Sequence, residues 1–485
     1  MASFTRVVAP SVVKNIGLVL LANALFMAVS VLVSVCYRFD SGFLPLLLST
    51  AVTASVGFFL FFLVKKTEGI ATREGYIVVV LSWIVSCLFG MLPYLFWGGE
   101  FSLINAWYES VSGYTTTGST ILTAVEAIPH SLLFWRASTH WIGGMGVVIF
   151  MLLILPEVSS VRLRLSRIEM STLSQESYRF RAKEKVRVIA YVYFGLTLLQ
   201  TLCLSLAGMP VFDAVCHSFS TIATGGFSIR NASIASYNSV AIETIILVFM
   251  VVSSLHFGMI FLFLVKKNTS SLTSVVTRYY LAFTLAVGMV ISLNLLQSGQ
   301  YDSIGTCLRH GLFQTFSIAS TTGFATTDSS VWPGLSMLIL FFLMFQGGCS
   351  GSTAGGIKAD RLLIAFRSVR AHITKKLHPR SVISVRVGEQ VIDSDVVFEV
   401  HLFIGLFFFL FFVVALLLVA LGVTLTEALS ASAAHISNVG PGFGNLGSLG
   451  NYHAFNGLSK FVLSLTMILG RIELFGFFIL FSFRK

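Results

Sequence analysis

Residues 105–119 read NAWYESVSGYTTTGS, and three later stretches repeat this pattern. They begin at Asp213 with DAVCHSFSTIATGGF, at His310 with HGLFQTFSIASTTGF and at Glu427 with EALSASAAHISNVGP. Aligned without gaps, all four begin with a polar residue, carry a hydroxyl at the sixth position and have glycine at the fourteenth. The sixth-position residues are Ser110, Ser218, Thr315 and Ser432. Such internal similarity indicates one structural unit used four times.

The composition predicts that this unit lies in a membrane. Hydrophobic residues form 55% of the 485-residue chain and charged residues only 11%, against roughly 25% charged in a soluble domain. A water-soluble fold lacks the polar surface to cover that much apolar side chain, whereas a bilayer removes the need. This argues against a soluble enzyme, a nucleic-acid binder and a disordered protein, although the net charge is +11.

Ten apolar stretches are long enough to cross a membrane, since a helix needs about 20 residues to span the hydrocarbon core. They cover residues 15–36, 43–64, 76–97, 132–155, 188–207, 240–265, 279–297, 332–370 with an interruption, 400–421 and 459–482. The repeated stretches fall in shorter apolar segments at 104–115, 212–223, 309–320 and 426–437. Because these are too short to span and too apolar for surface loops, we expect re-entrant helices. The first span lacks a following small-residue cleavage site and is expected to stay uncleaved.

The sequence therefore predicts an all-α polytopic membrane protein built from a repeated helix, pore helix, filter loop and helix. Such a loop exposes backbone groups that must be buried in protein or face water, so we expect four pseudo-repeats around a central pore, preceded by two extra transmembrane helices. The expected division is a two-helix extension over 1–70, repeat 1 over 71–160, repeat 2 with a basic cytoplasmic loop over 161–268, repeat 3 with an interrupted second helix and an intramembrane loop over 269–380, and repeat 4 over 381–485.

The distribution of basic residues indicates how the chain is oriented across the membrane. With the N-terminus inside, 26 of the 32 Lys and Arg residues lie in inner segments, as the positive-inside rule requires. Both termini are then cytoplasmic. The outer segments are net acidic, which raises the local cation concentration. The inner segments 156–187 and 358–395 are basic enough to attract a partner protein or anionic membrane lipid.

The twelfth to fourteenth positions of each repeated stretch form the candidate filter. Glycine accepts positive φ freely, so the loop can turn its carbonyls toward the axis, and a ring of carbonyls can replace the hydration shell of potassium. Small residues could instead only allow close helix packing, but four copies in register favour an ion site. The candidate ion-binding residues are Thr116, Thr117, Gly118, Thr224, Gly225, Gly226, Thr321, Thr322, Gly323, Asn438, Val439 and Gly440.

The loops TTTGS, ATGGF, STTGF and SNVGPG, with the insert QGGCSGSTAGGIK and the segment LGRIELF, resemble the Trk/Ktr/HKT superfamily of potassium transporters, and in particular its bacterial TrkH/TrkG-type branch. The resemblance implies one pore per subunit, a homodimer in the bacterial inner membrane, and a cytosolic nucleotide-binding regulatory subunit of the TrkA type. In plant relatives, serine in place of the first filter glycine goes with sodium transport, so Gly118 favours potassium. Asn438 and Val439 depart from the other loops, and we expect an asymmetric ring.

The eighth span contains a glycine-rich interruption that we interpret as a gate. Five of the ten residues from Gly347 to Gly356 are glycine, which does not sustain a regular helix. Non-helical backbone at this depth must face protein or water. Together with the family resemblance, this favours a flexible loop that blocks the pore beneath the filter until it moves. The alternative is a static helix break at a subunit contact. The candidate gate residues are Gly347, Gly348, Gly351, Ser352, Gly355, Gly356 and Arg471.

Arg471 lies within the last apolar span, where a charged side chain is costly and indicates function. Facing the pore, it would oppose cation passage; alternatively, it is tied to a loop carbonyl or a carboxylate. Glu473 lies two residues later and points to another helix face, so it should not neutralise Arg471.

Three classes of function are compared for a membrane protein of this kind: a pore subunit, a coupled symporter and an intramembrane enzyme. The first is a potassium-translocating pore subunit of an uptake system, with potassium as cargo and no organic cofactor. The alternative is a sodium- or proton-coupled symporter that uses the same filter and would need coupling carboxylates in the spans. Glu473 is the only obvious acidic candidate within a span. An enzyme would need a nucleophile–base pair or two carboxylates in a span, and the sequence has neither pattern.

Overall fold

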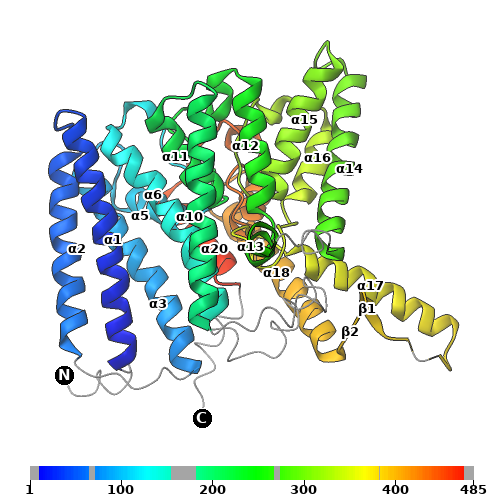
Figure 1. Cartoon of the computed structure of the whole chain (residues 1–485). Coiled ribbons are helices and arrows are strands. Elements are labelled where there is room, and N and C mark those ends of the chain that lie inside the picture. Colours follow the sequence, from blue (N-terminus) through cyan, green and yellow to red (C-terminus); the bar gives the residue numbers. More distant parts are fainter. Residues whose placement is uncertain (1–9, 65–71, 154–181, 267–273, 382, 474–485) are drawn as a thin grey trace.

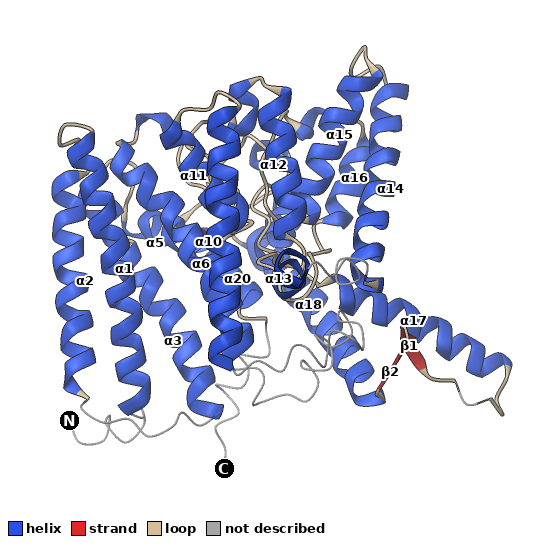
Figure 2. Cartoon of the chain, in the orientation of Figure 1, coloured by secondary structure: helices blue, strands red, loops and turns tan. Residues whose placement is uncertain are grey.

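The computed structural model describes residues 10–64, 72–153, 182–266, 274–381 and 383–473 (Figure 1). Almost all of the described regular structure is helical (Figure 2). Long helices stand side by side, and short helices enter between them from one end (Figure 1). Apolar side chains such as Phe58, Phe59 and Phe62 are largely exposed on the outer face of these helices. A bilayer covers such a surface, so the chain is an all-α polytopic membrane protein, as predicted.

Helices α1 (Pro10–Cys36) and α2 (Phe43–Leu63) form the N-terminal pair at the left edge of Figure 1. Their connection is tied to the rest of the chain by Asp40, whose carboxylate accepts hydrogen bonds from Ser34 Oγ, Gly42 N and both N and Oγ of Ser131. Partial burial opposes ionisation of Asp40, but these hydrogen bonds outweigh it and lower its pKa. The pair is therefore anchored to the first repeat at the connection between α1 and α2.

The first two repeats follow in the predicted order. Repeat 1 comprises α3 (Thr72–Gly90), α4 (Leu92–Trp97), the short helix α5 (Leu103–Tyr114) at the predicted pore-helix position, η1 (Val125–Ala127) and α6 (His130–Leu153). Repeat 2 comprises α10 (Ala182–Leu206), the pore helix α11 (Val211–Ile222), η2 (Ser233–Tyr237), α12 (Val240–Ser253) and α13 (Phe257–Lys266).

The last two repeats have the same order. Repeat 3 comprises α14 (Val275–Gln297), the pore helix α15 (Ile304–Ala319), η4 (Ser329–Val331), α16 (Gly334–Leu343) and α17 (Ala359–Leu377). Repeat 4 comprises α18 (Ser394–Ala420), the pore helix α19 (Leu425–Ile436), η5 (Gly444–Leu446) and α20 (Gly457–Arg471). In all four, a short 3₁₀ helix follows the filter loop.

Fewer helices have the length and composition of a full span than the ten expected. Within the described part of the chain, six do so, or seven if the bent pair α12–α13 is one span. The span expected over 240–265 is not one continuous helix, because the chain bends by 105° at the break between α12 and α13. The interruption within 332–370 is present, between α16 and α17.

Helix α17 and the hairpin of β1 (Val385–Val387) and β2 (Gln390–Ile392) project from the bundle at the lower right of Figure 1. Sequence reasoning did not predict this hairpin. Of the predicted repeat boundaries, the one at 380/381 lies between α17 and β1. The other three fall in 65–71, 154–181 and 267–273, outside the described residues, so the division into domains stays a prediction.

Candidate functional site

The four pore helices end in the same backbone conformation. The residue at the twelfth repeat position has left-handed φ in every copy, and the glycine at the fourteenth has positive φ in every copy. The φ values are 51°, 53°, 57° and 54° at Thr116, Thr224, Thr321 and Asn438, and 80°, 83°, 80° and 95° at Gly118, Gly226, Gly323 and Gly440. A left-handed β-branched residue is rare and strained. Three such threonines in register therefore mark a functional site.

Hydrogen bonds at the helix ends stabilise this conformation. In each copy the thirteenth residue donates its N–H to the carbonyl of the eighth, and the twelfth to that of the ninth. In repeat 1, for example, Thr117 N lies 3.0 Å from Ser112 O and Thr116 N lies 3.0 Å from Gly113 O. This is the Schellman pattern that ends many helices. The helix C-termini, with their partial negative charge, thus point at the filter loops, which we define as residues 116–118, 224–226, 321–323 and 438–440.

The filter loops close into a ring. A Cβ placed on Gly118 would overlap the carbonyl oxygen of Gly225, and one on Gly226 would overlap that of Thr322. In the same way Gly323 faces the carbonyl of Val439, and Gly440 faces that of Thr117. Each filter glycine therefore packs on the thirteenth-position carbonyl of the next repeat, in the order 1, 2, 3, 4 and back to 1. Glycine is required here both for positive φ and for this close approach.

The carbonyls of the filter loops are almost all without hydrogen bonds. Among the described residues, eleven of the twelve accept none, and the exception is Gly440. Nearly all backbone carbonyls in protein interiors are paired. A ring of ordered, unpaired carbonyls leaves oxygen ligands available for a cation that has lost water.

Side chains break the fourfold symmetry of the backbone. Thr117 Oγ1 pairs with Thr115 Oγ1 at 2.8 Å, and Thr322 Oγ1 pairs with Ser320 Oγ at 2.8 Å. Gly225 and Val439 cannot form this pair in the even-numbered repeats. Asn438 instead donates from Nδ2 to Thr117 Oγ1 and Met467 O, both at 3.0 Å. The expected asymmetry at Asn438 and Val439 is therefore present in the side chains and absent from the backbone.

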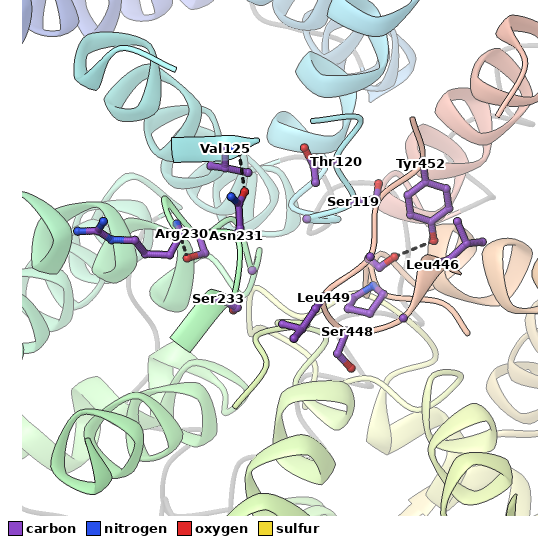
Figure 3. Close-up of a pocket in the computed structure, with 18 of the residues that line it drawn as sticks. Ser119, Thr120, Val125, Arg230, Asn231, Ser233, Leu446, Ser448, Leu449 and Tyr452 are labelled. Atoms are coloured by element: carbon purple, nitrogen blue, oxygen red, sulfur yellow. Dashed lines mark hydrogen bonds between the residues drawn. The ribbon is translucent and has the colours of Figure 1, made fainter. Parts of the chain in front are cut away.

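An outer cavity opens above the filter. All four filter glycines line it, together with polar residues of the loops that follow. Figure 3 shows Ser119 and Thr120 on one side, Asn231 and Ser233 on another, and Ser448 and Leu449 of repeat 4 on a third. Asn231 Oδ1 accepts a hydrogen bond from Val125 N at 2.7 Å, which joins the outer loops of repeats 1 and 2.

A buried ion pair lies next to the chain segments that follow filter loops 1 and 2. Arg136 Nε lies 2.6 Å from Glu109 Oε1, and the two side chains are 3% and 0% exposed. Glu109 also accepts from Ile121 N and Thr120 Oγ1, just after the loop. Arg136 donates from Nη1 to Ser228 O at 2.8 Å, so the pair joins the chain after filter loops 1 and 2.

Removing one member of this pair should destabilise the fold. Arg136→Met leaves the Glu109 carboxylate buried and uncompensated, which costs about 3–5 kcal/mol of unfolding free energy. The matched control is Arg230→Met, because Arg230 is 40% exposed and its partner Asp213 keeps the Tyr237 hydroxyl at 2.6 Å. Thermal unfolding in detergent should show a much larger drop in midpoint for Arg136→Met. Equal drops would contradict a special role for the buried pair.

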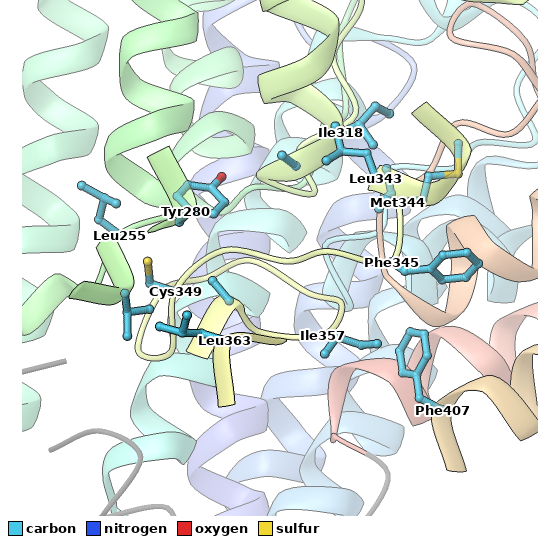
Figure 4. Close-up of a cluster of buried hydrophobic side chains, with 14 of the residues drawn as sticks. Leu255, Tyr280, Ile318, Leu343, Met344, Phe345, Cys349, Ile357, Leu363 and Phe407 are labelled. Atoms are coloured by element: carbon cyan, nitrogen blue, oxygen red, sulfur yellow. The ribbon is translucent and has the colours of Figure 1, made fainter. Parts of the chain in front are cut away.

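The glycine-rich loop, residues 344–358, lies beneath the filter between α16 and α17. Its ends pair with each other, since Gly347 N donates to Ile357 O at 2.8 Å and Ile357 N donates to Phe345 O at 3.0 Å. It packs in a cluster of buried apolar side chains, where Phe345 of the loop lies edge-on against Phe407 of α18 (Figure 4). The loop is therefore an ordered, buried segment.

The same loop explains the bend between α12 and α13. Cys349 N donates to Ser254 O at 2.8 Å, and Phe257 N donates to Gly351 O at 3.2 Å. Because the bend and the loop satisfy each other's backbone groups, neither needs to be helical. Gly351, with φ of 82°, packs so close to the His256 ring that a Cβ would clash with it. Of the other gate candidates, Gly348 packs on Ser254 O, Gly356 has φ of 64°, and Ser352 Oγ donates to Cys349 O.

The upper part of the loop contacts the filter region directly. Gly355 N donates to Thr321 Oγ1 at 2.7 Å, and a Cβ on Gly355 would overlap Ser437 O. Thr353 Oγ1 donates to Ile222 O, at the end of α11, at 3.0 Å. The loop thus lies against the ends of three pore helices.

Arg471 holds the loop in this position. Its Nη1 donates to Thr353 O at 2.7 Å, and its side chain is almost fully buried. Its Nε and Nη2 have no hydrogen-bond partner in the described part of the chain. Glu473 lies beyond the end of α20, with φ of 55°, and its carboxylate pairs with Arg361 of α17 at 2.5 Å. The expected separation of Arg471 and Glu473 on two faces of one helix is therefore wrong, because the helix ends at Arg471. The structure thus places Arg471 on a loop carbonyl, one of the two alternatives.

Sequence reasoning named Thr116, Thr224 and Thr321 as site residues but did not predict their left-handed conformation. It also missed two further side chains. The His140 ring of α6 explains why residue 225 is glycine, because a Cβ at this position would clash with the ring. Lys358 is buried at the end of the glycine-rich loop and donates to Ala354 O. Only tertiary contacts identify these side chains.

Comparison with known proteins agrees with this architecture. The family model TrkH, described as a cation transport protein, matches residues 46–484. The Trk system potassium uptake protein TrkH of Salmonella typhimurium (strain LT2) is 33% identical over 476 residues, covering 97% of this chain and 98% of that protein. The Trk system potassium uptake protein TrkG of Escherichia coli (strain K12) is 33% identical over 423 residues, 86% of each chain. A crystal structure of the potassium transporter TrkH from Vibrio parahaemolyticus superposes with a TM-score of 0.89 at 33% identity, covering 97% of this chain and 98% of that one.

Proposed function

Since the chain belongs to the TrkH family of cation transport proteins, we propose that it is the potassium-translocating pore subunit of a potassium uptake system. It is a membrane transporter and not an enzyme. The observation that carries the proposal is the closed ring of filter loops with eleven unpaired carbonyls among the described residues. Potassium is the cargo, and the chemistry requires no organic cofactor.

In this proposal the filter loops select the ion. Potassium enters the outer cavity, sheds water and binds to the carbonyls of the ring. The pore-helix C-termini add partial negative charge. The hydrogen bonds at the end of each pore helix hold the carbonyls in place, so the ring does not collapse onto a smaller ion.

The glycine-rich loop would be the gate. It lies directly beneath the filter, bound to Thr321, to the end of α11 and to Arg471. The Arg471 guanidinium adds a positive charge on the cation pathway, which raises the barrier for potassium. Conduction requires the loop to move away and its hydrogen bonds to be exchanged for water.

We further propose that the chain lies in a bacterial inner membrane with cytoplasmic termini, acts as a homodimer and is controlled by a cytosolic nucleotide-binding subunit of the TrkA type. The names of the relatives, which refer to a Trk system, support a multi-component assembly. The described basic residues of α17, such as Arg370, Lys375 and Lys376, give this inner surface a positive charge. Most of the second basic segment, 156–187, lies outside the described residues.

Ion flux into liposomes of defined composition tests the function. Purified protein should take up potassium down its gradient and should discriminate against sodium. Dependence of potassium uptake on an imposed sodium or proton gradient would favour the coupled symporter, for which Asp360 is a buried carboxylate with Oδ2 unpaired among the described residues. No potassium flux at all would contradict both candidates.

A further inference from the structure

The outer loop of repeat 4 reaches back to the filter through Tyr452. The side chain is 2% exposed, and its hydroxyl donates to the Gly440 carbonyl at 3.0 Å (Figure 3). The N–H of the same residue donates to Thr120 O at 2.8 Å. Tyr452 therefore joins the filter loop of repeat 4 to the chain just after the filter loop of repeat 1, its neighbour in the ring.

The ring of Tyr452 is held by a buried aromatic wall. It packs edge-on against His435, with centroids 4.8 Å apart, and lies 5.9 Å from the Tyr108 ring. His435 Nδ1 lies 2.7 Å from Ala431 O, which can only accept, so Nδ1 carries the proton. Its Nε2 then accepts from the Tyr108 hydroxyl at 2.7 Å. Both ring nitrogens of His435 and the Tyr108 hydroxyl thus have hydrogen-bond partners. The Tyr452 hydroxyl donates to the Gly440 carbonyl of the filter.

This contact makes one filter carbonyl chemically different. Over the described residues, the equivalent carbonyls of Gly118, Gly226 and Gly323 accept no hydrogen bond. Those three glycines are also partly exposed to the outer cavity, whereas Gly440 is buried. The outermost ring therefore consists of three free oxygens and one that a phenol restrains.

We propose that Tyr452 is a specificity-determining positioning residue that keeps the Gly440 carbonyl from following a smaller ion toward the axis. The inference rests on the proposed potassium function. A restrained carbonyl oxygen keeps a distance from the bound ion that suits potassium, whereas a free carbonyl oxygen can move closer and bind sodium. Selectivity depends on the number, distance and field of such carbonyl dipoles. The hydroxyl acts through this carbonyl and does not itself contact the ion.

Tyr452→Phe tests the proposal, because it removes the donor and keeps the ring. The matched control is Tyr237→Phe, which removes a hydroxyl that donates to Asp213 at 2.6 Å and not to a filter carbonyl. In liposomes, Tyr452→Phe should lower the potassium-to-sodium uptake ratio about fivefold, equivalent to about 1 kcal/mol. The maximal potassium rate should stay close to that of the parent, and the control should keep the parental ratio.

A second measurement separates positioning from plain stabilisation. Thermal unfolding in detergent is recorded for parent and Tyr452→Phe, each in potassium and in sodium. If Tyr452 positions the Gly440 carbonyl, the difference between the unfolding midpoints in potassium and in sodium should be smaller in Tyr452→Phe than in the parent. A hydroxyl with only a structural role would lower both midpoints equally, and that result, or an unchanged uptake ratio, overturns the inference. A parent that does not transport potassium would instead refute the proposed function.

Discussion

Replacing Gly118 with serine should largely abolish discrimination between potassium and sodium. Two independent constraints act at this position. The φ of 80° strains any side-chain-bearing residue, at a cost of about 1–3 kcal/mol. The added Cβ would also overlap the carbonyl oxygen of Gly225, one of the proposed ligands. Relief of that overlap must move a carbonyl of the ring, so we expect the uptake ratio to fall by about tenfold or more.

The other filter glycines provide an internal comparison. Serine at Gly226, Gly323 or Gly440 meets the same two constraints, because each packs on the next repeat. Gly405→Ser is the matched control, since Gly405 lies in α18 and a Cβ added there would meet no atom of another element within 4 Å. Uptake ratios that match the parent in all four filter variants would contradict the proposed ion site. The amount of folded protein must be measured alongside, so that lost flux is not mistaken for lost selectivity.

Deleting Ser352–Ala354 should raise potassium flux while leaving the uptake ratio near that of the parent. The deletion removes Thr353 O, the acceptor for Arg471, and the Thr353 hydroxyl bonded to the end of α11. It keeps the hydrogen bonds of Cys349 and Gly351 to the bend between α12 and α13. A hydrogen bond to a charged group contributes about 1.5–3 kcal/mol. Its loss should shift the closed–open equilibrium, and hence the flux, roughly 10- to 100-fold.

Arg471→Gln tests the same gate without shortening the chain. It removes the buried charge and should also raise the flux, whereas Arg370→Gln on the exposed part of α17 should not. Both measurements use the subunit alone in liposomes, so that no regulatory partner is involved. A deletion variant that folds but transports no faster than the parent would identify the glycine-rich loop as a purely structural helix break.

Much of the filter could be predicted from local sequence. The short apolar segments, their alignment and the glycine at the fourteenth position identify the pore helices and the turns that follow them. The left-handed threonines were not predicted, because threonine alone gives no sign of positive φ. The bend at Ser254–Phe257 was missed for a related reason. Its residues read as part of one apolar span, and only the glycine-rich loop packed against them supplies the hydrogen bonds that permit the break.

The sequence by itself determined the membrane location, the four repeats, the pore-helix positions and the interruption of the eighth span. These properties depend on composition and on patterns within about 20 residues, the length that a bilayer imposes on each helix. Only the tertiary structure decided the order in which the loops close, the support of Glu109 by Arg136, the placement of Arg471 on Thr353 and the restraint of Gly440 by Tyr452. Such contacts join segments far apart in the chain, and each depends on where whole helices pack around the pore.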